Sequence, residues 1–193
     1  KYFDKFLKDK SIGKLISFRS YCYAGGDYCN IDGNISTDEA RPNHNIFPSA
    51  PNWVPKLKQK QFEKFLNYFI HDINLIRYFF GSNLNISSAN INKNSSNIVF
   101  EVNNVTGIFQ GVYIEQNRWD EGLEIIFERG MIKITLPPAF LINQPANVEI
   151  YNDNKNLLTI SPKADWTWAF KRQAYNFIDI LRENKNSISS AND

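Results

Sequence analysis

Polar side chains recur at helical spacing within the strongly apolar segment 65–81. Four of them fall at i, i+4, i+7 and i+11 and would align in one stripe on a helix: Asn67, His71, Asn74 and Tyr78. An imidazole titrates close to neutral pH, so His71 is suited to moving a proton to or from a hydroxyl or carbonyl group. The spacing alone is equally compatible with a partly buried histidine whose hydrogen bonds are satisfied.

The polar stripe needs a helix, and the apolar residues of the same segment predict one. They form a neighbouring stripe that is wide enough to face a core: Phe62, Phe65, Leu66, Phe69, Ile73, Ile76 and Phe80. We therefore expect a helix from about Leu57 to Phe80, closed by Gly81 as a left-handed cap residue. Asp72 follows His71 directly but points about 100° away on a helix, so a structural role is the better interpretation of its carboxyl group.

Most of the remaining chain alternates with the period of two that strands show. Strands are expected in seven runs: 15–23, 98–102, 108–114, 123–127, 132–136, 148–150 and 157–160. Glu128-Arg129-Gly130-Met131 has the composition of a tight hairpin turn. A short amphipathic helix is expected near Phe3–Leu7. A closing helix is expected over 166–181, where apolar residues recur at helical spacing behind Asp165, whose side chain suits an N-cap. This order predicts an α+β fold: a mostly antiparallel open-faced sheet with helices packed on one face.

The second face of this sheet is expected to meet a partner. Gln110, Glu101 and Glu124 stand there among apolar residues, a mixture too apolar for open solvent and too polar for a core. Such a face often pairs two subunits, so we expect self-association through it.

Length and charge limit the class of protein. A chain of 193 residues suits one domain over 1–193. Its 22 Lys and Arg residues nearly balance its 20 Asp and Glu residues, which disfavours nucleic acid as a partner. No run approaches the roughly 20 apolar residues that a bilayer span needs, so no membrane partner is expected.

Cysteine usage and the first residues favour a cytoplasmic protein. Cys22 and Cys29 cannot fill a zinc site by themselves, and we expect both to be free thiols, with no metal site. Residues 1–5 do not begin a secretory signal.

A long polar connection, from about Gly25 to Pro55, precedes the predicted helix. Connections of this length are usually functional or disordered. Trp53 could stack against the apolar face of a sugar or fix the loop to the sheet, and Arg41 and His44 could reach an anionic group or simply be solvated.

Several segments, in their order and spacing, resemble the Gfo/Idh/MocA oxidoreductases. Ile12-Gly13-Lys14-Leu15 is similar to the entry into the first strand of that family's second domain, and 71–78 with Gly81 is similar to its histidine helix. Glu128-Arg129-Gly130-Met131-Ile132 resembles its hairpin turn, and 173–183 resembles its late helix. The resemblance spans nearly the whole chain.

The resemblance implies that the chain is the substrate-binding and oligomerisation domain of a two-domain enzyme. Family members also have a dinucleotide-binding Rossmann domain, but this sequence has no Gly-x-Gly-x-x-Gly and no Glu-Lys-Pro. We therefore expect NAD or NADP in the full-length protein, with no cofactor bound by these residues and no activity of this chain alone.

The resemblance also assigns roles within the polar stripe. His71 matches the family's acid/base histidine, while Asn67 stands where many relatives have an aspartate. An amide can orient a hydroxyl group but cannot accept a proton at ordinary pH. We assign His71 and Asn67 to catalysis, and Trp53 and Asn74 to substrate binding.

The expected function is that of a domain of an NAD(P)-dependent oxidoreductase for a sugar, cyclitol or nucleotide sugar. The alternatives are a non-catalytic ligand-binding and dimerisation module, and a relative that uses NAD to cleave glycosides. The sequence does not determine the substrate, the choice between NAD and NADP, the direction of reaction or the oligomeric state.

Overall fold

The computed structural model describes residues 12–25, 38–40, 50–116, 118–138, 141, 144–153, 158–162, 168–183 and 187. The elements among them are, in order, β1 (Leu15–Gly25), α2 (Lys56–Phe80), β2 (Asn85–Ile91), β3 (Ser95–Val102), β4 (Val105–Ile114), β5 (Trp119–Phe127), β6 (Gly130–Leu136), β7 (Asn147–Asn152), β8 (Leu158–Ile160) and α3 (Ala169–Glu183).

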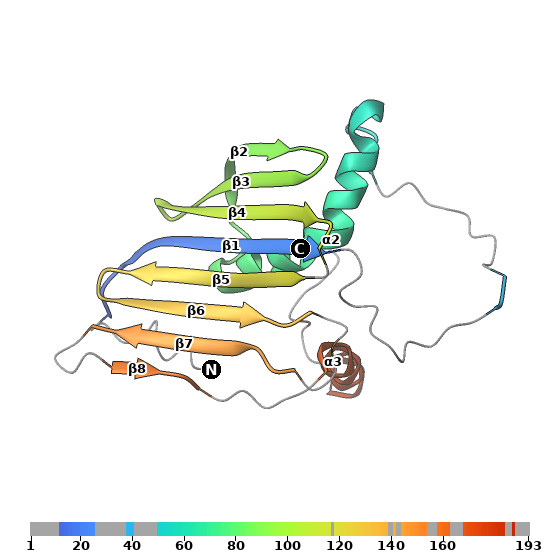
Figure 1. Ribbon diagram of the computed structural model, residues 1–193. Coiled ribbons are helices and arrows are strands. Elements are labelled where there is room, and N and C mark those ends of the chain that lie inside the picture. Colours follow the sequence, from blue (N-terminus) through green and yellow to red (C-terminus); the bar gives the residue numbers. More distant parts are fainter. Residues whose placement is uncertain are drawn as a thin grey trace.

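The strands form one eight-stranded sheet in the order β2-β3-β4-β1-β5-β6-β7-β8 (Figure 1). Two antiparallel meanders, β2 to β4 and β5 to β8, lie on either side of β1. β1 pairs antiparallel with β5 and parallel with β4, which makes it the centre of the sheet. The first strand in sequence therefore joins two hairpin-built halves that are contiguous in the chain.

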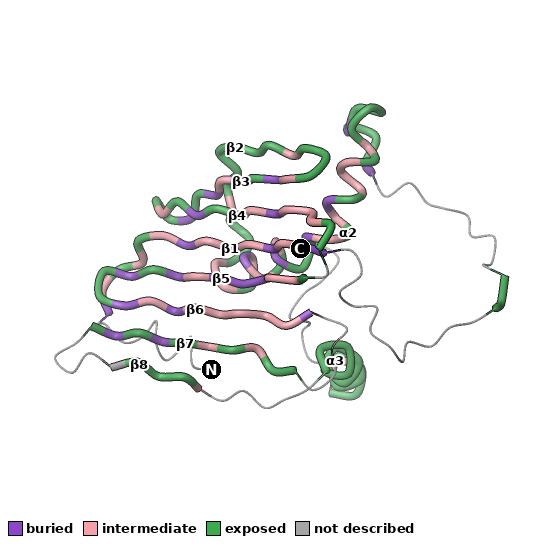
Figure 2. The backbone as a smooth tube through the Cα atoms, viewed as in Figure 1, coloured by how far each residue is buried: buried purple, intermediate pink, exposed green. Residues whose placement is uncertain are grey.

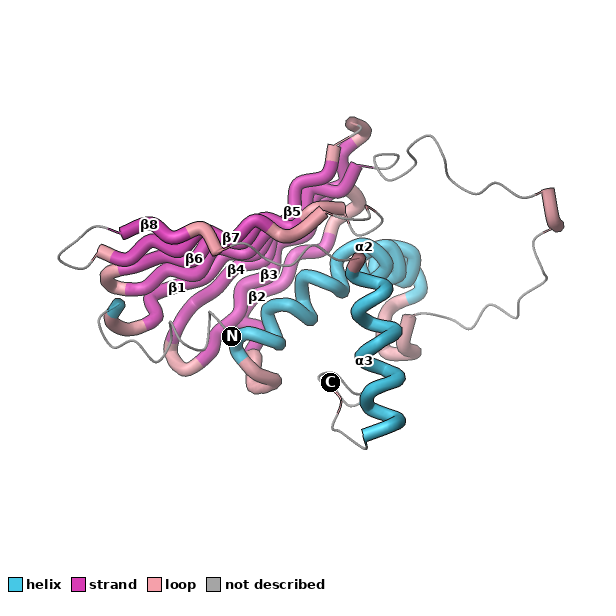
Figure 3. The backbone as a smooth tube through the Cα atoms, turned by 90° about the horizontal axis from the view of Figure 1, so that it is seen from below, coloured by secondary structure: helices cyan, strands magenta, loops and turns pink. Residues whose placement is uncertain are grey.

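Helix α2 crosses one face of the sheet and leaves the other face open (Figure 3). Its side chains Phe65 and Phe69 pack edge to face on Phe109 of β4, with ring centroids 6.2 and 5.5 Å apart. At the other end of the helix, Phe80 stacks on Phe18 of β1 at 4.1 Å. The core thus lies between α2 and the central strands.

The core face of the sheet follows from the period-two alternation. Every second residue of β3 and β5 is buried, and the buried apolar cluster includes Phe18, Ile98, Phe100, Phe109, Leu123, Ile125 and Ile132. Two glycines of β4 face this cluster and make room for rings. A Cβ atom at Gly107 would overlap the Phe18 ring, and one at Gly111 would lie 2.6 Å from the Phe69 ring.

Helix α3 contributes nothing buried to this core. None of its residues is buried, and Phe177 and Leu181 are 62% and 67% exposed. Figure 2 shows the helix exposed along its length. Its apolar stripe is therefore uncovered within the described part of the chain.

The predicted fold class is confirmed: the protein is α+β, with a mostly antiparallel open-faced sheet. The predicted 57–80 helix begins one residue earlier, at Lys56, and ends at Phe80 as expected. Gly81 has the expected positive φ of 86°, but its ψ of 178° lies outside the left-handed helical region. Its N–H donates to the Arg77 carbonyl oxygen at 2.7 Å.

Edge strand β2 was not predicted, because Asn85–Ile91 is mostly polar and exposed and carries no apolar alternation. The predictions for residues 1–11 and for Asp165 lie outside the described residues. No helix in the described part of the chain is long and apolar enough to cross a membrane.

Candidate functional site

The predicted polar stripe lies on the outer side of α2. The four buried residues of the helix are Phe65, Phe69, Asp72 and Ile76. Each stripe residue follows one of these by two positions, which turns it about 200° around the helix, away from the sheet. All four stripe residues are accordingly exposed: Asn67, His71, Asn74 and Tyr78. The imidazole of His71 is open to solvent and to any group that approaches this side of α2.

Three of the four predicted site residues share this outer surface. Asn67 lies one turn before His71 and Asn74 one turn after it, so the three side chains are neighbours on the helix. The Asn74 Oδ1 atom accepts a hydrogen bond from Arg77 Nε at 3.1 Å, which fixes its amide toward the C-terminal end of the helix.

Trp53 lies elsewhere on the helix surface. Its indole ring packs edge to face on Phe62, with centroids 5.7 Å apart, and is 75% exposed. Phe62 is about 140° around the helix from Asn67, so Trp53 packs on a different side of α2 from the polar stripe. Its ring face nevertheless remains available to a ligand.

A buried polar cluster lies on the inner side of α2, directly beneath the stripe. Asp72, Ser20 and Cys22 are at most 1% exposed, and Glu121 is 8% exposed. Ser20 Oγ lies 3.4 Å from Asp72 Oδ1 and 3.3 Å from the carbonyl oxygen of Gly122. Glu121 is paired in register with Cys22 and accepts a hydrogen bond from Trp119 Nε1 at 2.9 Å.

Burial raises the pKa of both carboxyl groups and of the thiol in this cluster. It raises the pKa of Asp72 to about 9, and repulsion by Glu121 adds to the rise. Burial also raises the pKa of Glu121, against the effect of its hydrogen bond from Trp119. The Cys22 thiol has a raised pKa through burial and the neighbouring carboxyl groups, so Cys22 is a free but unreactive cysteine.

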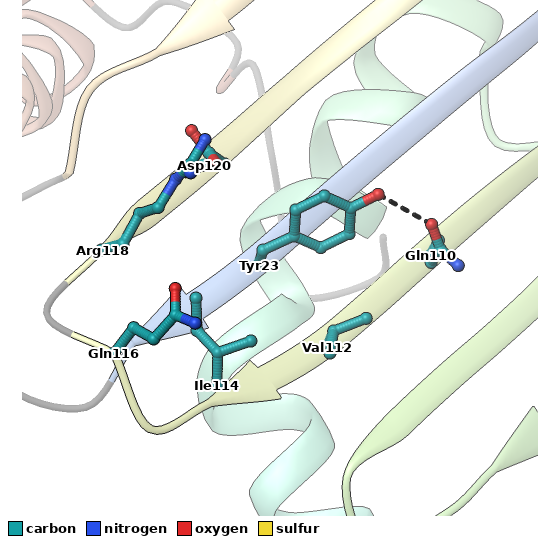
Figure 4. Close-up of a pocket in the computed structure, with 7 residues that line it drawn as sticks. All are labelled: Tyr23, Gln110, Val112, Ile114, Gln116, Arg118 and Asp120. Atoms are coloured by element: carbon teal, nitrogen blue, oxygen red, sulfur yellow. Dashed lines mark hydrogen bonds and ion pairs between the residues drawn. The ribbon is translucent and has the colours of Figure 1, made fainter.

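A shallow hollow of about 420 Å³ lies on the opposite, open face of the sheet. Figure 4 shows its lining side chains, which come from β1, β4, β5 and the β4–β5 connection: Tyr23, Gln110, Val112, Ile114, Gln116, Arg118 and Asp120. The Tyr23 hydroxyl donates to Gln110 Oε1 at 2.8 Å and accepts from Arg19 Nη2 at 3.1 Å. The Arg118 guanidinium group pairs with Asp120 at 2.6 Å. The hollow therefore combines an aromatic ring with polar groups that are already paired.

The same face carries a row of alternating charges across four neighbouring strands. In register order, Arg19 of β1 stands beside Glu124 of β5, Glu124 beside Lys133 of β6, and Lys133 beside Glu149 of β7. Arg19 Nη1 lies 3.8 Å from Glu124 Oε2. Opposite charges on adjacent strands stabilise their pairing modestly and leave the face close to neutral.

Sequence reasoning did not find the partners of Asp72. A signal for Glu121 was present, because the alternation Trp119, Glu121, Leu123 in β5 places the carboxyl group on the core face. No local signal connects Ser20 or Asp72 to it, because these residues are brought together only by the packing of α2. His44, Arg41 and Cys29 lie outside the described residues.

Within the described residues, no glycine-rich turn opens a helix at the end of a parallel strand. A doubly wound fold binds pyrophosphate at the C-terminal ends of parallel strands, where a glycine-rich turn opens a helix. Here β1 and β4 are the single parallel pair of the described sheet, and α2 begins after Pro55 without a side-chain cap. No group of three or more His, Cys, Asp or Glu side chains within the described ranges is placed to hold a metal ion.

Comparison with known proteins relates this geometry to oxidoreductases. No protein-family model matches the chain, and no curated protein is similar to it in sequence. Solved structures do match. A protein assigned as an NADPH-dependent oxidoreductase from Desulfitobacterium hafniense superposes with a TM-score of 0.66 at 9% identity, over 99% of this chain and 53% of its own.

Two further solved structures also match. One is of an enzyme named for a nucleotide sugar, and the other contains a nucleotide ligand. UDP-N-acetylglucosamine 3-dehydrogenase from Acidithiobacillus ferrooxidans matches with a TM-score of 0.57 at 9% identity, over 96% of this chain and 51% of its own. A 3-ketoreductase from Actinomadura kijaniata, in complex with TDP-benzene and NADP, matches with a TM-score of 0.60 at 13% identity, over 95% and 49%.

The chain has the fold found in Gfo/Idh/MocA-type oxidoreductases. It spans about half the length of the solved structures that it matches. At these identities the Gfo/Idh/MocA likeness establishes the fold, whereas the role of each site residue rests on its position and chemistry.

Proposed function

We propose that this chain is the substrate-side domain of an NAD(P)-dependent oxidoreductase that acts on a sugar, cyclitol or nucleotide sugar. In this proposal residues 1–193 form one domain, and a separate dinucleotide-binding domain of the same protein holds the cofactor. His71 exchanges a proton with the reacting hydroxyl or carbonyl group, and Asn67 and Asn74 orient the substrate.

The observation that carries the proposal is the exposed imidazole of His71 between two amide side chains, each one turn away, on the outer side of α2. The sheet occupies the inner side of the helix, so a substrate would reach these groups from the outer side, where the proposal also puts the second domain. The fold similarity to oxidoreductases of sugars supports the same arrangement.

The chemistry of the three side chains suits a polyhydroxylated substrate. An imidazole can donate or accept a proton near neutral pH, and an asparagine amide offers both donors and an acceptor to vicinal hydroxyl groups. Trp53 would add a flat apolar surface if a substrate extended toward the N-terminal part of α2. The exposed ring of Trp53 is consistent with this use.

Asn67 supports a second candidate, a non-catalytic ligand-binding and dimerisation module. Asn67 cannot supply the negative charge that an aspartate would place one turn from His71. In this candidate the stripe binds a sugar without turnover, and the open sheet face pairs two subunits.

The test is hydride transfer by the protein that contains this chain, measured as reduced nicotinamide across a panel of sugars and nucleotide sugars. Replacing a general acid/base typically lowers turnover by about 10²- to 10⁴-fold, so we expect a loss of this size for His71→Asn. Lys58→Gln, an exposed change on the same helix, is the matched control and should retain turnover.

Two results would decide against the enzyme proposal. Full activity of the His71→Asn variant would remove the assigned acid/base group. Tight binding of the cofactor with no turnover of any sugar would favour the non-catalytic module instead.

The chain by itself should not bind the cofactor. Because the described residues form no glycine-rich phosphate turn at a helix N-terminus, titration of the 193-residue chain with NADP should show no saturable binding by calorimetry. Micromolar binding would contradict the proposed division of labour between two domains.

We also propose that two copies of the chain associate through the open sheet face. The row of Arg19, Glu124, Lys133 and Glu149 alternates in sign, so the same row reversed by a two-fold axis along the strands meets opposite charges. Ile108, Ile126 and Tyr151 on this face are 38–42% exposed and supply apolar area.

A further inference from the structure

We propose that Asp72 and Glu121 form a buried proton-binding site between α2 and the sheet, so that the seating of α2 is linked to the uptake of a proton. The proposal goes beyond the proposed function, and none of its steps depends on that function.

The two contacts of Ser20 fit a protonated Asp72. Ser20 Oγ lies within hydrogen-bond distance of two acceptors, Asp72 Oδ1 and the Gly122 carbonyl oxygen, but the hydroxyl has a single hydrogen. Both contacts are satisfied when Asp72 is protonated, because the carboxyl group then donates to Ser20 Oγ and Ser20 donates to Gly122. With an ionised Asp72, the single hydrogen of Ser20 can serve only one of these two oxygens.

The second oxygen of Asp72 is not compensated either. Asp72 Oδ2 is buried without a hydrogen-bond partner, and the residue is 1% exposed. A buried carboxylate with an unsatisfied oxygen is strongly disfavoured, whereas a neutral carboxyl group is tolerated far better.

No cation relieves this charge. The titratable groups that face Asp72 are the Glu121 carboxyl group from β5, whose negative charge opposes ionisation of Asp72, and the Cys22 thiol from β1, which stays protonated and donates a hydrogen bond to Asp72. Tyr68 of α2 and Tyr113 of β4 lie next to the Cys22 side of the cluster. No lysine, arginine or histidine of the described residues forms an ion pair with Asp72 or Glu121.

Proton uptake is therefore coupled to helix packing. Asp72 is the polar member of the buried stripe of α2, so its carboxyl group leaves the core only if the helix lifts from β1. Burial raises the pKa of Asp72 from its ordinary value of 3.8 to about 9. Between pH 3.8 and about 9, Asp72 is ionised when α2 is detached from the sheet and protonated when α2 is packed on it. The packing of α2 therefore weakens as the pH rises.

Infrared spectroscopy of the chain tests the protonation directly. At pH 7 the difference spectrum of wild type minus Asp72→Asn should contain the carbonyl band of a protonated carboxylic acid. The same difference for Glu101→Gln, an exposed acid on β3, should lack the band. Absence of the Asp72 band at pH 7 would overturn the proposal.

Alkylation of Cys22 tests the coupling to α2. Cys22 is fully buried beneath the helix, so iodoacetamide reaches it only when α2 lifts. Peptide mass spectrometry distinguishes modified Cys22 from modified Cys29. The alkylation rate of Cys22 is divided by that of a free thiol at the same pH. The normalised Cys22 rate should rise up to tenfold per pH unit between pH 6 and 8 in the wild type, because one proton is released.

In Asp72→Asn the normalised rate should rise less steeply with pH than in the wild type, because only Glu121 then remains to take up a proton, while Glu101→Gln should behave as wild type. An equal pH dependence in Asp72→Asn and wild type would overturn the coupling. If Asp72→Asn does not fold, the wild-type infrared band titrated from pH 6 to 10 decides: it must persist at neutral pH and disappear near pH 9. Its loss below pH 6 would overturn the proposal.

Discussion

At Asp72 the chain retains a carboxyl group at a position where an apolar residue would pack without cost. The residue occupies the buried stripe of α2, between Phe69 and Ile76. Its raised pKa means that folding must either retain a proton or bury a charge at neutral pH. A neutral amide of the same shape removes this requirement and keeps both a hydrogen-bond donor and an acceptor beside Ser20.

We therefore predict that Asp72→Asn changes the pH dependence of stability. The wild-type pKa is raised on folding, so the native state binds more protons than the unfolded state above pH 3.8, and stability falls until about pH 9. The wild type should lose up to about 1.4 kcal/mol per pH unit relative to the variant over this window. Urea unfolding at pH 5, 6, 7 and 8 provides the measurement, and parallel curves for the two proteins would contradict it.

Among the elements, β4 is adapted to its neighbours by glycines on its core face. The Phe18 ring lies where a Cβ of residue 107 would be, so Gly107→Ala forces the ring or the strand to move. We predict a loss of about 1–3 kcal/mol in the free energy of unfolding, as for other overpacked cores. Thr106→Ala, one residue away on the exposed face, should cost less than about 1 kcal/mol in the same urea titration. Equal costs at the two positions would mean that the close approach of Phe18 does not limit packing.

The two helices should differ sharply in what they contribute to stability. Phe69 of α2 is 0% exposed and contacts four aromatic rings, whereas Phe177 of α3 is 62% exposed. Phe69→Ala should therefore cost about 3–5 kcal/mol, and Phe177→Ala should stay within about 0.5 kcal/mol. Chemical denaturation of the two matched variants measures the contrast, and a large loss at Phe177 would show that α3 packs on the domain.

For the molecule as a whole, the open sheet face is the surface through which we propose that two copies associate. Its centre combines Tyr21 and Tyr23, 5.5 Å apart, with the row of alternating charges. Aromatic residues and arginine are the groups most often found at the energetic centre of protein interfaces.

We predict that the chain sediments as a dimer and that Ile108→Lys shifts it to the monomer. Ile108 stands beside Arg19 on the face, so a lysine there adds a second positive charge to the centre of the contact. Ile86→Lys, on edge strand β2, is the control and should leave the dimer intact. Sedimentation velocity at matched concentration distinguishes the outcomes, and a monomeric wild type at all concentrations would contradict pairing through this face.

Elements with a strong hydrophobic periodicity could be predicted from the amino-acid sequence alone. The 3.6-residue pattern of 62–80 placed α2 to within one residue, and the alternation of 98–102 and 123–127 identified both the strands and their core faces. It also placed His71, Asn67 and Asn74 on one side of a helix, because that relation is local. Edge strand β2 has no such pattern, since neither of its faces is buried.

The tertiary contacts show which faces of the sheet and of α2 pack against other segments. The insertion of β1 between β4 and β5 depends on pairing across about a hundred residues, which no local pattern encodes. The polar stripe proved to be turned away from the sheet, and Asp72 proved to lie beneath it against Ser20, 52 residues away in sequence. Periodicity specifies which side chains share a face, whereas the packing of distant segments specifies which face is buried and which acids lie near one another in the core.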